Sequence, residues 1–284
     1  MPKDVYVIDL FCGCGGFSEG ARQAGAKVIL AVDCWKEALA VHEANHPETE
    51  HLCTTLGGDL DEFASFLTGF IDLNVPPGGH VHIHASPPCQ LISQVNRDRD
   101  VSQGLKLVNW SLNLIHQVNP HSWSLEEVYA QELMPYIESF GGGVIHMKKY
   151  GIPSTRRRII LGPLNVSRMI EESPTCLQGI LDKCNYTCPT GFDRQTDGTR
   201  NGKDRVQLST RSLQELSYTV TGTAPYLVNA NGVRKLLPVD ICACIQTFPL
   251  DYFKVEVPKM RRMVANAVPP KMARVLVSAI QSLK

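Results

Sequence analysis

Hydrophobic residues in the first half of the chain form short β-branched runs that alternate with longer stretches of helical period. Four runs predict strands, at 5–9, 27–33, 80–86 and 121–128. Three stretches between them predict helices, at 17–25, 35–46 and 105–117. Strands that alternate with helices are typical of a doubly wound, mostly parallel α/β sheet, which binds its ligands at the carboxyl ends of the strands.

The pattern changes after about residue 163. From there to about residue 232 the chain is polar, rich in Gly, Thr, Asn and Cys, and shows no strong period. This texture predicts a small irregular domain or a long functional insertion. Apolar helical patterns return at 238–247 and 269–283. We therefore expect a catalytic domain over 1–162, the irregular domain over 163–232, and a return segment over 233–284 that completes the first domain.

Composition places the chain among globular proteins and leaves a nucleic-acid partner open. Of 284 residues, 43% are hydrophobic, which excludes a disordered or fibrous chain. Lys plus Arg and Asp plus Glu are both 28, so the net charge is zero and a nucleic acid would require a local basic surface. The densest basic cluster is the run of three arginines at 156–158.

The chain shows no sign of export or of membrane insertion. It opens directly on a predicted strand, and no apolar run reaches the roughly 18 residues that span a bilayer. We expect an intracellular protein with no membrane partner, whose ten cysteines are mostly reduced.

A glycine turn follows the first predicted strand, in the sequence DLFCGCGGF from Asp9 to Phe17. Such a turn lets a ligand approach the backbone and exposes N–H groups at the start of a helix, although a plain tight turn has the same composition. The spacing is not that of a dinucleotide-binding motif. Asp33 ends the next strand and suits a ribose hydroxyl or a helix N-cap, and Asp59 follows Gly57 and Gly58. Together these acids favour a nucleoside-containing cofactor.

Three further segments carry reactive side chains at predicted strand ends. In SPPCQLIS two prolines precede Cys89, which is either a nucleophile or a buried structural cysteine. Glu126 or Glu127 is a candidate general acid. Arg156 and Arg158 alternate with Arg157, so we expect them to share one face and to bind phosphate or a base edge, or else to form a solvated basic edge.

With these blocks in this order, the chain resembles the DNA (cytosine-5) methyltransferases. The blocks are DLFCGCGG, the strand-end acid Asp33, GD at 58–59, PPCQ, the E-x-V at 126–128, the R-x-R at 156–158, QTFP at 246–249 and NAVPP at 266–270. The resemblance implies a Rossmann-like fold of the S-adenosylmethionine-dependent class I methyltransferases, with a small target-recognition domain at 163–232. The implied reaction transfers a methyl group from S-adenosylmethionine to C5 of a flipped-out cytosine in duplex DNA, through a covalent bond between Cys89 and C6.

The same resemblance assigns roles residue by residue. The cofactor-binding residues would be Asp9, Phe11, Gly13, Gly15, Gly16, Asp33, Cys34, Trp35, Asp59, Leu60, Pro88, Asn266 and Val268. The catalytic residues would be Cys89, Glu126, Arg156 and Arg158, and the substrate-binding residues Gln90 and Ser93. No metal ion is implied. We expect a monomer, in the cytoplasm or nucleoid if the source is prokaryotic or viral and in the nucleus if it is eukaryotic, with a restriction partner or as an orphan enzyme.

The chain departs from the family pattern at several positions, and two alternatives stay open. Glu127 stands where the family has Asn, and Ser154 where it has Gln. Leu91 and Ile92 replace a Pro-Phe pair, and Asp240 and Ile241 replace an Arg-Glu pair. A second carboxylate at 127 favours the acid form of Glu126 or disturbs its hydrogen bonds. One alternative is methylation of tRNA by the same side chains; the other is a DNA-binding relative with weakened catalysis.

Three patterns are reminiscent of metal sites. The sequence HEANH at 42–46 fits a zinc-protease motif, but Pro47 follows it and we expect an ordinary surface helix. His80, His82 and His84 alternate along a strand, for which packing under a helix is favoured over metal binding. Cys184 and Cys188, with Cys176 nearby, form at most half of a zinc site, because no histidine lies close to them in sequence.

Overall fold

The computed structural model describes residues 4–88, 92, 100–164, 166–201, 207–254 and 259–282. The predicted nucleophile Cys89 and the predicted substrate-binding residues Gln90 and Ser93 lie outside the described residues. The chain divides into two compact units. The first comprises 1–145, 157–170 and 273–284, and the second comprises 146–156 and 171–272.

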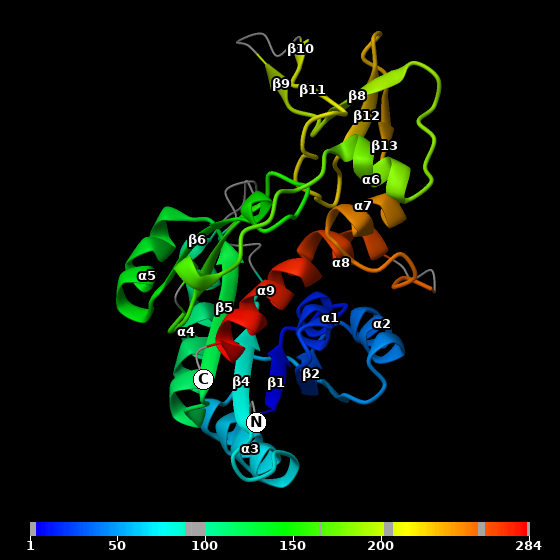
Figure 1. The fold of residues 1–284 in the computed structure, drawn as a ribbon. Helices are drawn as coiled ribbons and strands as arrows, with labels where there is room; N and C mark the ends of the chain where they lie inside the picture. Colours follow the sequence, from blue (N-terminus) through cyan, green and yellow to red (C-terminus); the bar gives the residue numbers. More distant parts are fainter. Residues whose placement is uncertain are drawn as a thin grey trace. The chain divides into compact units, whose positions relative to one another are not determined.

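A seven-stranded sheet forms the centre of the first unit (Figure 1). Its strands are β1 (Val5–Leu10), β2 (Lys27–Asp33), β3 (Glu50–Cys53), β4 (His80–Ala85), β5 (Ser122–Val128), β6 (Gly142–His146) and β7 (Arg157–Leu161). Their order is β3-β2-β1-β4-β5-β7-β6, with β3 to β5 parallel and β7 antiparallel to β5. The strand order reverses between β1 and β4, which is where open α/β sheets bind ligands. The predicted doubly wound α/β fold is confirmed.

Helices follow the strands of this sheet. They are α1 (Gly16–Gln23), α2 (Lys36–Asn45), α3 (Leu60–Asn74), α4 (Val101–Val118), α5 (Met134–Phe140) and α9 (Pro270–Gln281), with short 3-10 turns η2 (Gln131–Leu133) and η4 (Val166–Arg168). A further 3-10 turn, η3 (Met147–Lys149), belongs to the second unit. The pattern of hydrophobic residues did not predict β3 or α3. No helix in the described part of the chain is long and apolar enough to cross a membrane.

The two faces of the central strands differ in chemistry because side chains alternate along each strand. On one face Ile8, Leu10, Ile83 and Leu125 join residues of α3 and α4 in the main hydrophobic core. On the other face the strands carry buried polar side chains, namely Asp9, His82, His84, Ser122, Ser124 and Glu126. A polar face that is buried requires internal hydrogen bonds, so this side of the sheet is the place to look for a site.

Short antiparallel strands form the sheet of the second unit. They are β8 (Phe192–Thr196), β11 (Arg211–Ser212), β12 (Tyr226–Asn229) and β13 (Arg234–Leu236), in the order β11-β8-β12-β13. A separate pair joins β9 (Arg200–Asn201) to β10 (Gln207–Leu208), and the helices are α6 (Leu177–Lys183), α7 (Val239–Ile245) and α8 (Met260–Asn266). The segment expected to be irregular therefore contains a small sheet. This unit also takes in 146–156 and 233–272, which the sequence analysis placed in the catalytic domain.

Candidate active site

The glycine turn between β1 and α1 adopts a backbone shape that few side chains allow. Phe11, Gly13 and Gly15 all have positive φ angles, of 59°, 53° and 91°. Gly15 is the N-cap residue of α1 and has no side chain of its own with which to cap this helix. A Cβ atom built on Gly13 would meet no atom within 4 Å, so open space borders the turn. The arrangement offers backbone donors to an incoming ligand.

Asp33 binds this turn from the end of the neighbouring strand. Its Oδ2 accepts a hydrogen bond from the Gly13 N–H at 2.8 Å, and its Oδ1 accepts one from the Trp35 N–H at 2.8 Å. Trp35, rather than Asp33, is the N-cap residue of α2. The cofactor prediction combined the glycine turn with the strand-end carboxylate of Asp33, and the structure shows a direct hydrogen bond between the two.

The loop after β4 begins at the same turn. The Ser86 N–H donates to Leu10 O and its hydroxyl donates to Phe11 O, both at 3.2 Å. Pro88, which follows two residues later, is exposed. The carboxyl ends of β1, β2 and β4 are thus tied together by three polar contacts around Phe11 and Gly13.

Glu126 and Arg158 form an ion pair at the carboxyl end of β5. Arg158 Nε lies 2.8 Å from Glu126 Oε1, and the side chains are only 13% and 7% exposed, respectively. The register explains the contact, because β7 runs antiparallel to β5 and pairs Arg158 with Val128. Residues 126 and 128 share a face of β5, so Arg158 lies diagonally across from Glu126. The family resemblance assigned both residues to catalysis, but it did not predict their contact with each other.

Residues 5–131 match the profile of the C-5 cytosine-specific DNA methylases. This part of the chain is therefore a domain of that family. M.AgeI of Thalassovita gelatinovora, a Type II methyltransferase, is 30% identical over 187 residues, which span 61% of this chain and 42% of M.AgeI. M.HindV of Haemophilus influenzae, also a Type II methyltransferase, is 24% identical over 303 aligned residues, with 96% of this chain and 95% of the relative covered.

A solved structure shares the fold over the whole length. A protein encoded within an E. coli prophage and described as a DNA modification methyltransferase gives a TM-score of 0.71 at 19% sequence identity, with 99% of both chains covered. The predicted family and fold are therefore confirmed.

Two more motif residues of this cytosine-5 methylase, Asn266 and Val268, lie in the second unit with Arg156. The Arg156 side chain is 2% exposed, and it donates from Nη1 to Ala265 O at 2.9 Å and from Nη2 to Ala267 O at 3.2 Å. Asn266 lies between these two carbonyl groups and is exposed, whereas Val268 is buried. Arg156 precedes β7 and fixes the segment that carries Asn266, so its bonds differ from those of Arg158.

The remaining predicted cofactor residues of the methylase follow strands β2 and β3 of the first unit. Cys34 is exposed and Trp35 is half-buried at the start of α2. Leu60 is the first residue of α3 and packs against the main core. Asp59 is the N-cap of α3, and its Oδ1 accepts a hydrogen bond from the Glu62 N–H at 2.9 Å. Asp59 therefore has a structural task in addition to any contact with a ligand.

Glu127, the carboxylate that replaces the family's Asn, lies on the opposite face of β5 from Glu126. Its side chain is fully buried, and burial followed by repulsion from Glu126 raises its pKa to about 8. The Val128 N–H donates to its Oε2 at 2.5 Å. On the same face the Arg157 guanidinium stacks 3.6 Å from the centre of the Tyr129 ring. Glu127 is thus held as a neutral group at neutral pH, closer to an amide in charge than to a second anion.

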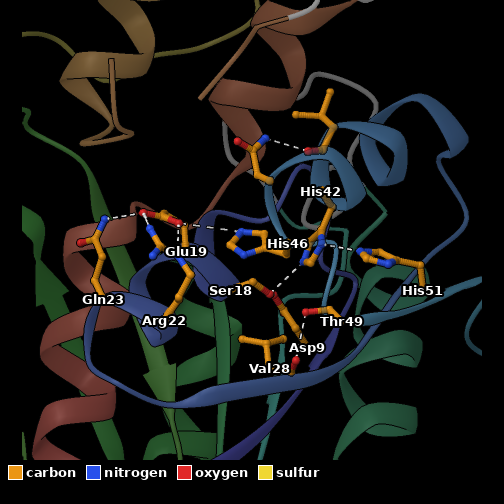
Figure 2. Close-up of polar contacts among 12 residues, drawn as sticks. Asp9, Ser18, Glu19, Arg22, Gln23, Val28, His42, His46, Thr49 and His51 are labelled. Atoms are coloured by element: carbon orange, nitrogen blue, oxygen red, sulfur yellow. Dashed lines mark hydrogen bonds and ion pairs between the residues drawn. The ribbon is translucent and has the colours of Figure 1, made fainter. Parts of the chain in front are cut away.

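Asp9 has buried partners that the sequence analysis missed. It is fully buried, and its Oδ2 accepts a hydrogen bond of 2.7 Å from the Ser18 hydroxyl (Figure 2). Ser18 is bonded in turn to His42 at 2.9 Å. The expectation of an ordinary surface helix at HEANH is wrong in this respect, because His42 and His46 are both fully buried. His42 lies on the inner face of α2 and His46 follows its last residue on the same side, so the spacing of four residues was the available signal.

The other two metal-like patterns make contacts of different kinds. His82 is bonded to Ser122 and Ser124, and the Phe17 ring of α1 stacks on His84 at 3.5 Å, so the strand does pack under a helix. Cys184 lies against Cys244 of α7, with 2.6 Å between the sulfur atoms. Among the described residues no group of three His, Cys, Asp or Glu side chains is arranged to hold a metal ion.

Proposed function

We propose that this protein transfers a methyl group from S-adenosylmethionine to C5 of cytosine in DNA. The observation that carries the proposal is the buried ion pair between Glu126 and Arg158, 2.8 Å apart at the end of β5. A carboxyl group held in one orientation in a nearly dry site can bind the edge of a base and stabilise charge that develops on its ring. The family membership makes cytosine that base.

The residues of the glycine turn fit S-adenosylmethionine. The turn offers backbone N–H groups and open space, and Asp33 lies beside it with a carboxylate suited to ribose hydroxyls. Asp9 is buried nearby, and its Oδ1 has no hydrogen-bond partner among the described residues. An anionic group with an unused oxygen suits the cationic methionine end of this cofactor. The set would be completed by Phe11, Gly15, Gly16, Cys34, Trp35, Asp59, Leu60, Pro88, Asn266 and Val268.

When bound, the cofactor supplies an electrophilic methyl group. In the proposed reaction the Cys89 thiolate forms a bond to C6 of a flipped-out cytosine, and the electron pair of the C5–C6 double bond moves toward C5. Glu126 holds the base and, in its protonated form, donates a proton to N3, which it takes back when the thiolate leaves; Arg158 fixes the orientation of the Glu126 carboxyl group. After C5 has gained the methyl group, a base removes the C5 proton, and the C6–S bond breaks to release the thiolate. Gln90 and Ser93 would contact the flipped nucleotide.

The second unit would bind the DNA around the target base. Because the net charge is zero, binding requires a local basic surface. Arg194 of β8 and Arg234 of β13 both pair with Val228 of β12, so they share one face of the small sheet, and both are exposed. Arg194 lies within 163–232 and Arg234 just beyond it, which supports the proposal that this segment recognises the target sequence. The protein would act as a monomer inside the cell, since one chain contains every assigned residue.

The test is transfer of labelled methyl groups from S-adenosylmethionine to unmethylated duplex DNA and, separately, to tRNA. We expect label on DNA only, loss of that label in Cys89→Ala, and unchanged cofactor binding in that variant. Label on tRNA alone would establish the RNA alternative, which the family and the named relatives disfavour. No label on either, with the cofactor still bound, would point to a DNA-binding relative that has lost catalysis. Bisulfite sequencing of methylated DNA would then give the target site.

A further inference from the structure

Three consecutive hydrogen bonds connect buried Asp9 to His51 near the surface of the first unit (Figure 2). Ser18 Oγ lies 2.7 Å from Asp9 Oδ2, His42 Nε2 lies 2.9 Å from Ser18 Oγ, and His51 Nε2 lies 2.8 Å from His42 Nδ1. Asp9, Ser18 and His42 are fully buried, whereas His51 is partly exposed. The three bonds span β1, α1, α2 and β3, so the chain of contacts depends on the tertiary fold.

The direction of these bonds follows from the chemistry of the groups. An ionised Asp9 only accepts, so the Ser18 hydroxyl donates to it and is left to accept from His42 Nε2–H. Burial keeps the pKa of His42 well below its usual value, so its ring is neutral and its Nδ1 accepts from His51 Nε2–H. All three donors then point toward Asp9. This direction of the three bonds requires a negative charge on Asp9, because a protonated Asp9 would donate to Ser18 and reverse all three.

Among the residues that the structure describes, no cation next to Asp9 balances that charge. The titratable groups closest to Asp9 are Asp33 from β2, His84 opposite it on β4, and Cys12 and Cys14 of the glycine turn. Burial keeps the pKa of His84 well below its usual value, so this ring is neutral as well. Around His42 the nearby groups are His46, Glu19 and Arg22, and Arg22 is paired with Glu19 at 2.9 Å. The positive charge opposite Asp9 is therefore left to a ligand.

We propose that Ser18 and His42 are positioning residues, which hold Asp9 ionised and turned toward the glycine turn so that it binds the cationic end of the cofactor. This inference rests on the proposed use of S-adenosylmethionine, whose methionine end carries a sulfonium and an ammonium group. The Ser18 hydroxyl, held by His42, donates to one oxygen of Asp9, and the second oxygen, Oδ1, remains for the ligand. The two residues act through Asp9 and make no contact with the cofactor.

Protonation of Asp9 at low pH weakens the binding of a cationic ligand. Burial raises the pKa of Asp9 to about 7, and the hydrogen bond from Ser18 opposes that rise. Below this pH a cationic ligand must displace a proton from Asp9, so its affinity falls by up to about tenfold per pH unit. Without the Ser18 hydroxyl the pKa of Asp9 rises further. The pH range in which acid weakens cofactor binding then moves to higher pH.

The experiment measures the dissociation constant of S-adenosylmethionine by calorimetry from pH 5.5 to pH 9, for the intact protein, Ser18→Ala and His42→Gln. We expect Ser18→Ala to bind about tenfold more weakly at pH 7 and nearly as tightly as the intact protein at pH 9. His42→Gln should change in the same direction. His46→Gln is the matched control, because His46 directly follows the same helix and is equally buried but is absent from the three bonds. The dissociation constant of His46→Gln should depend on pH as that of the intact protein does.

The outcomes separate this inference from the proposed function. A uniform loss of affinity at every pH in Ser18→Ala would show a merely structural role and overturn the inference, as would a profile identical to that of the intact protein. Binding in two buffers with different ionisation enthalpies gives a second readout, since the intact protein should release protons on binding at pH 6. If the intact protein does not bind S-adenosylmethionine at any pH, the proposed function itself fails.

Discussion

Arg158 Nε and Glu126 Oε1 lie 2.8 Å apart, in side chains that two antiparallel strands hold almost completely out of water. The diagonal register between β5 and β7 brings together two residues that are far apart in the sequence. In such a site each partner fixes the orientation of the other, and removal of one leaves the other charge buried and unpaired.

We expect the ion pair to control the rate of methyl transfer. Glu126→Gln keeps the shape of the side chain but removes the proton donor, and we expect kcat to fall by about a hundredfold or more. Arg158→Lys should also reduce kcat strongly, because an ammonium group does not reproduce the planar guanidinium. Single-turnover methyl transfer to DNA measures both. Arg157→Lys, on the opposite face of β7, is the control and should retain activity within about twofold.

Asp33→Ala should weaken the binding of S-adenosylmethionine. The variant loses the carboxylate that binds the glycine turn and the proposed ribose contact, which together predict a loss of about 1–3 kcal/mol in binding free energy. Calorimetric titration of the cofactor checks this. Asp61→Asn, an exposed position on α3, should bind as the intact protein does. An unchanged dissociation constant in Asp33→Ala would contradict the ribose role.

Substitutions of Asp59 should separate its two tasks. Asp59→Ala removes the N-cap of α3 and should lower the free energy of unfolding by about 1 kcal/mol. Asp59→Ser keeps a capping oxygen, so its stability should stay close to that of the intact protein while its cofactor binding weakens. Urea denaturation and cofactor titration of both variants give the comparison. Equal cofactor affinity in Asp59→Ser and the intact protein would leave only the capping role.

Glu127 should make the protein less stable as the pH rises. Its folded pKa of about 8 lies above the ordinary value of 4.5, so the unfolded chain loses the proton first. The stabilising contribution is complete below pH 4.5 and is lost by pH 8, at up to about 1.4 kcal/mol per pH unit. Glu127→Gln lacks this slope, so relative to the intact protein it should gain stability between pH 5 and pH 8. Urea denaturation of both proteins at pH 5 and pH 8 measures this difference in the free energy of unfolding. An equal change of that free energy in both proteins would contradict the prediction.

Arg156→Ala should destabilise the second unit. The substitution leaves the carbonyl groups of Ala265 and Ala267 without their charged donor, and we expect a loss of about 1.5–3 kcal/mol in the free energy of unfolding. Differential scanning calorimetry should show a lower melting temperature. Arg194→Ala removes an exposed arginine of the same unit and should shift the melting temperature little. If both variants melt alike, Arg156 does not hold the segment around Asn266.

The sequence predicted the elements whose signal is local. The strands at 5–10, 27–33, 80–85 and 122–128 and the helices around 16–23, 36–45 and 101–118 were found because burial of one face imposes a period on nearby residues. The helix α3 and the strand β3 were not predicted. The strands of the second unit were missed because they are short and are stabilised by partners far along the chain, as when Gln195 pairs with Leu227.

The sequence by itself determined the doubly wound α/β class, the family, and the order of the motif residues from Asp9 to Val268, because each motif is a short run of neighbouring residues. Only the tertiary structure decided which of these residues meet. Arg158 pairs with Glu126 while Arg156 bonds to Ala265, and Asp9 acquires Ser18 and His42 as buried partners. Such contacts join different strands and helices, and burial then sets the charge of each group, so they depend on packing that no single segment of sequence specifies.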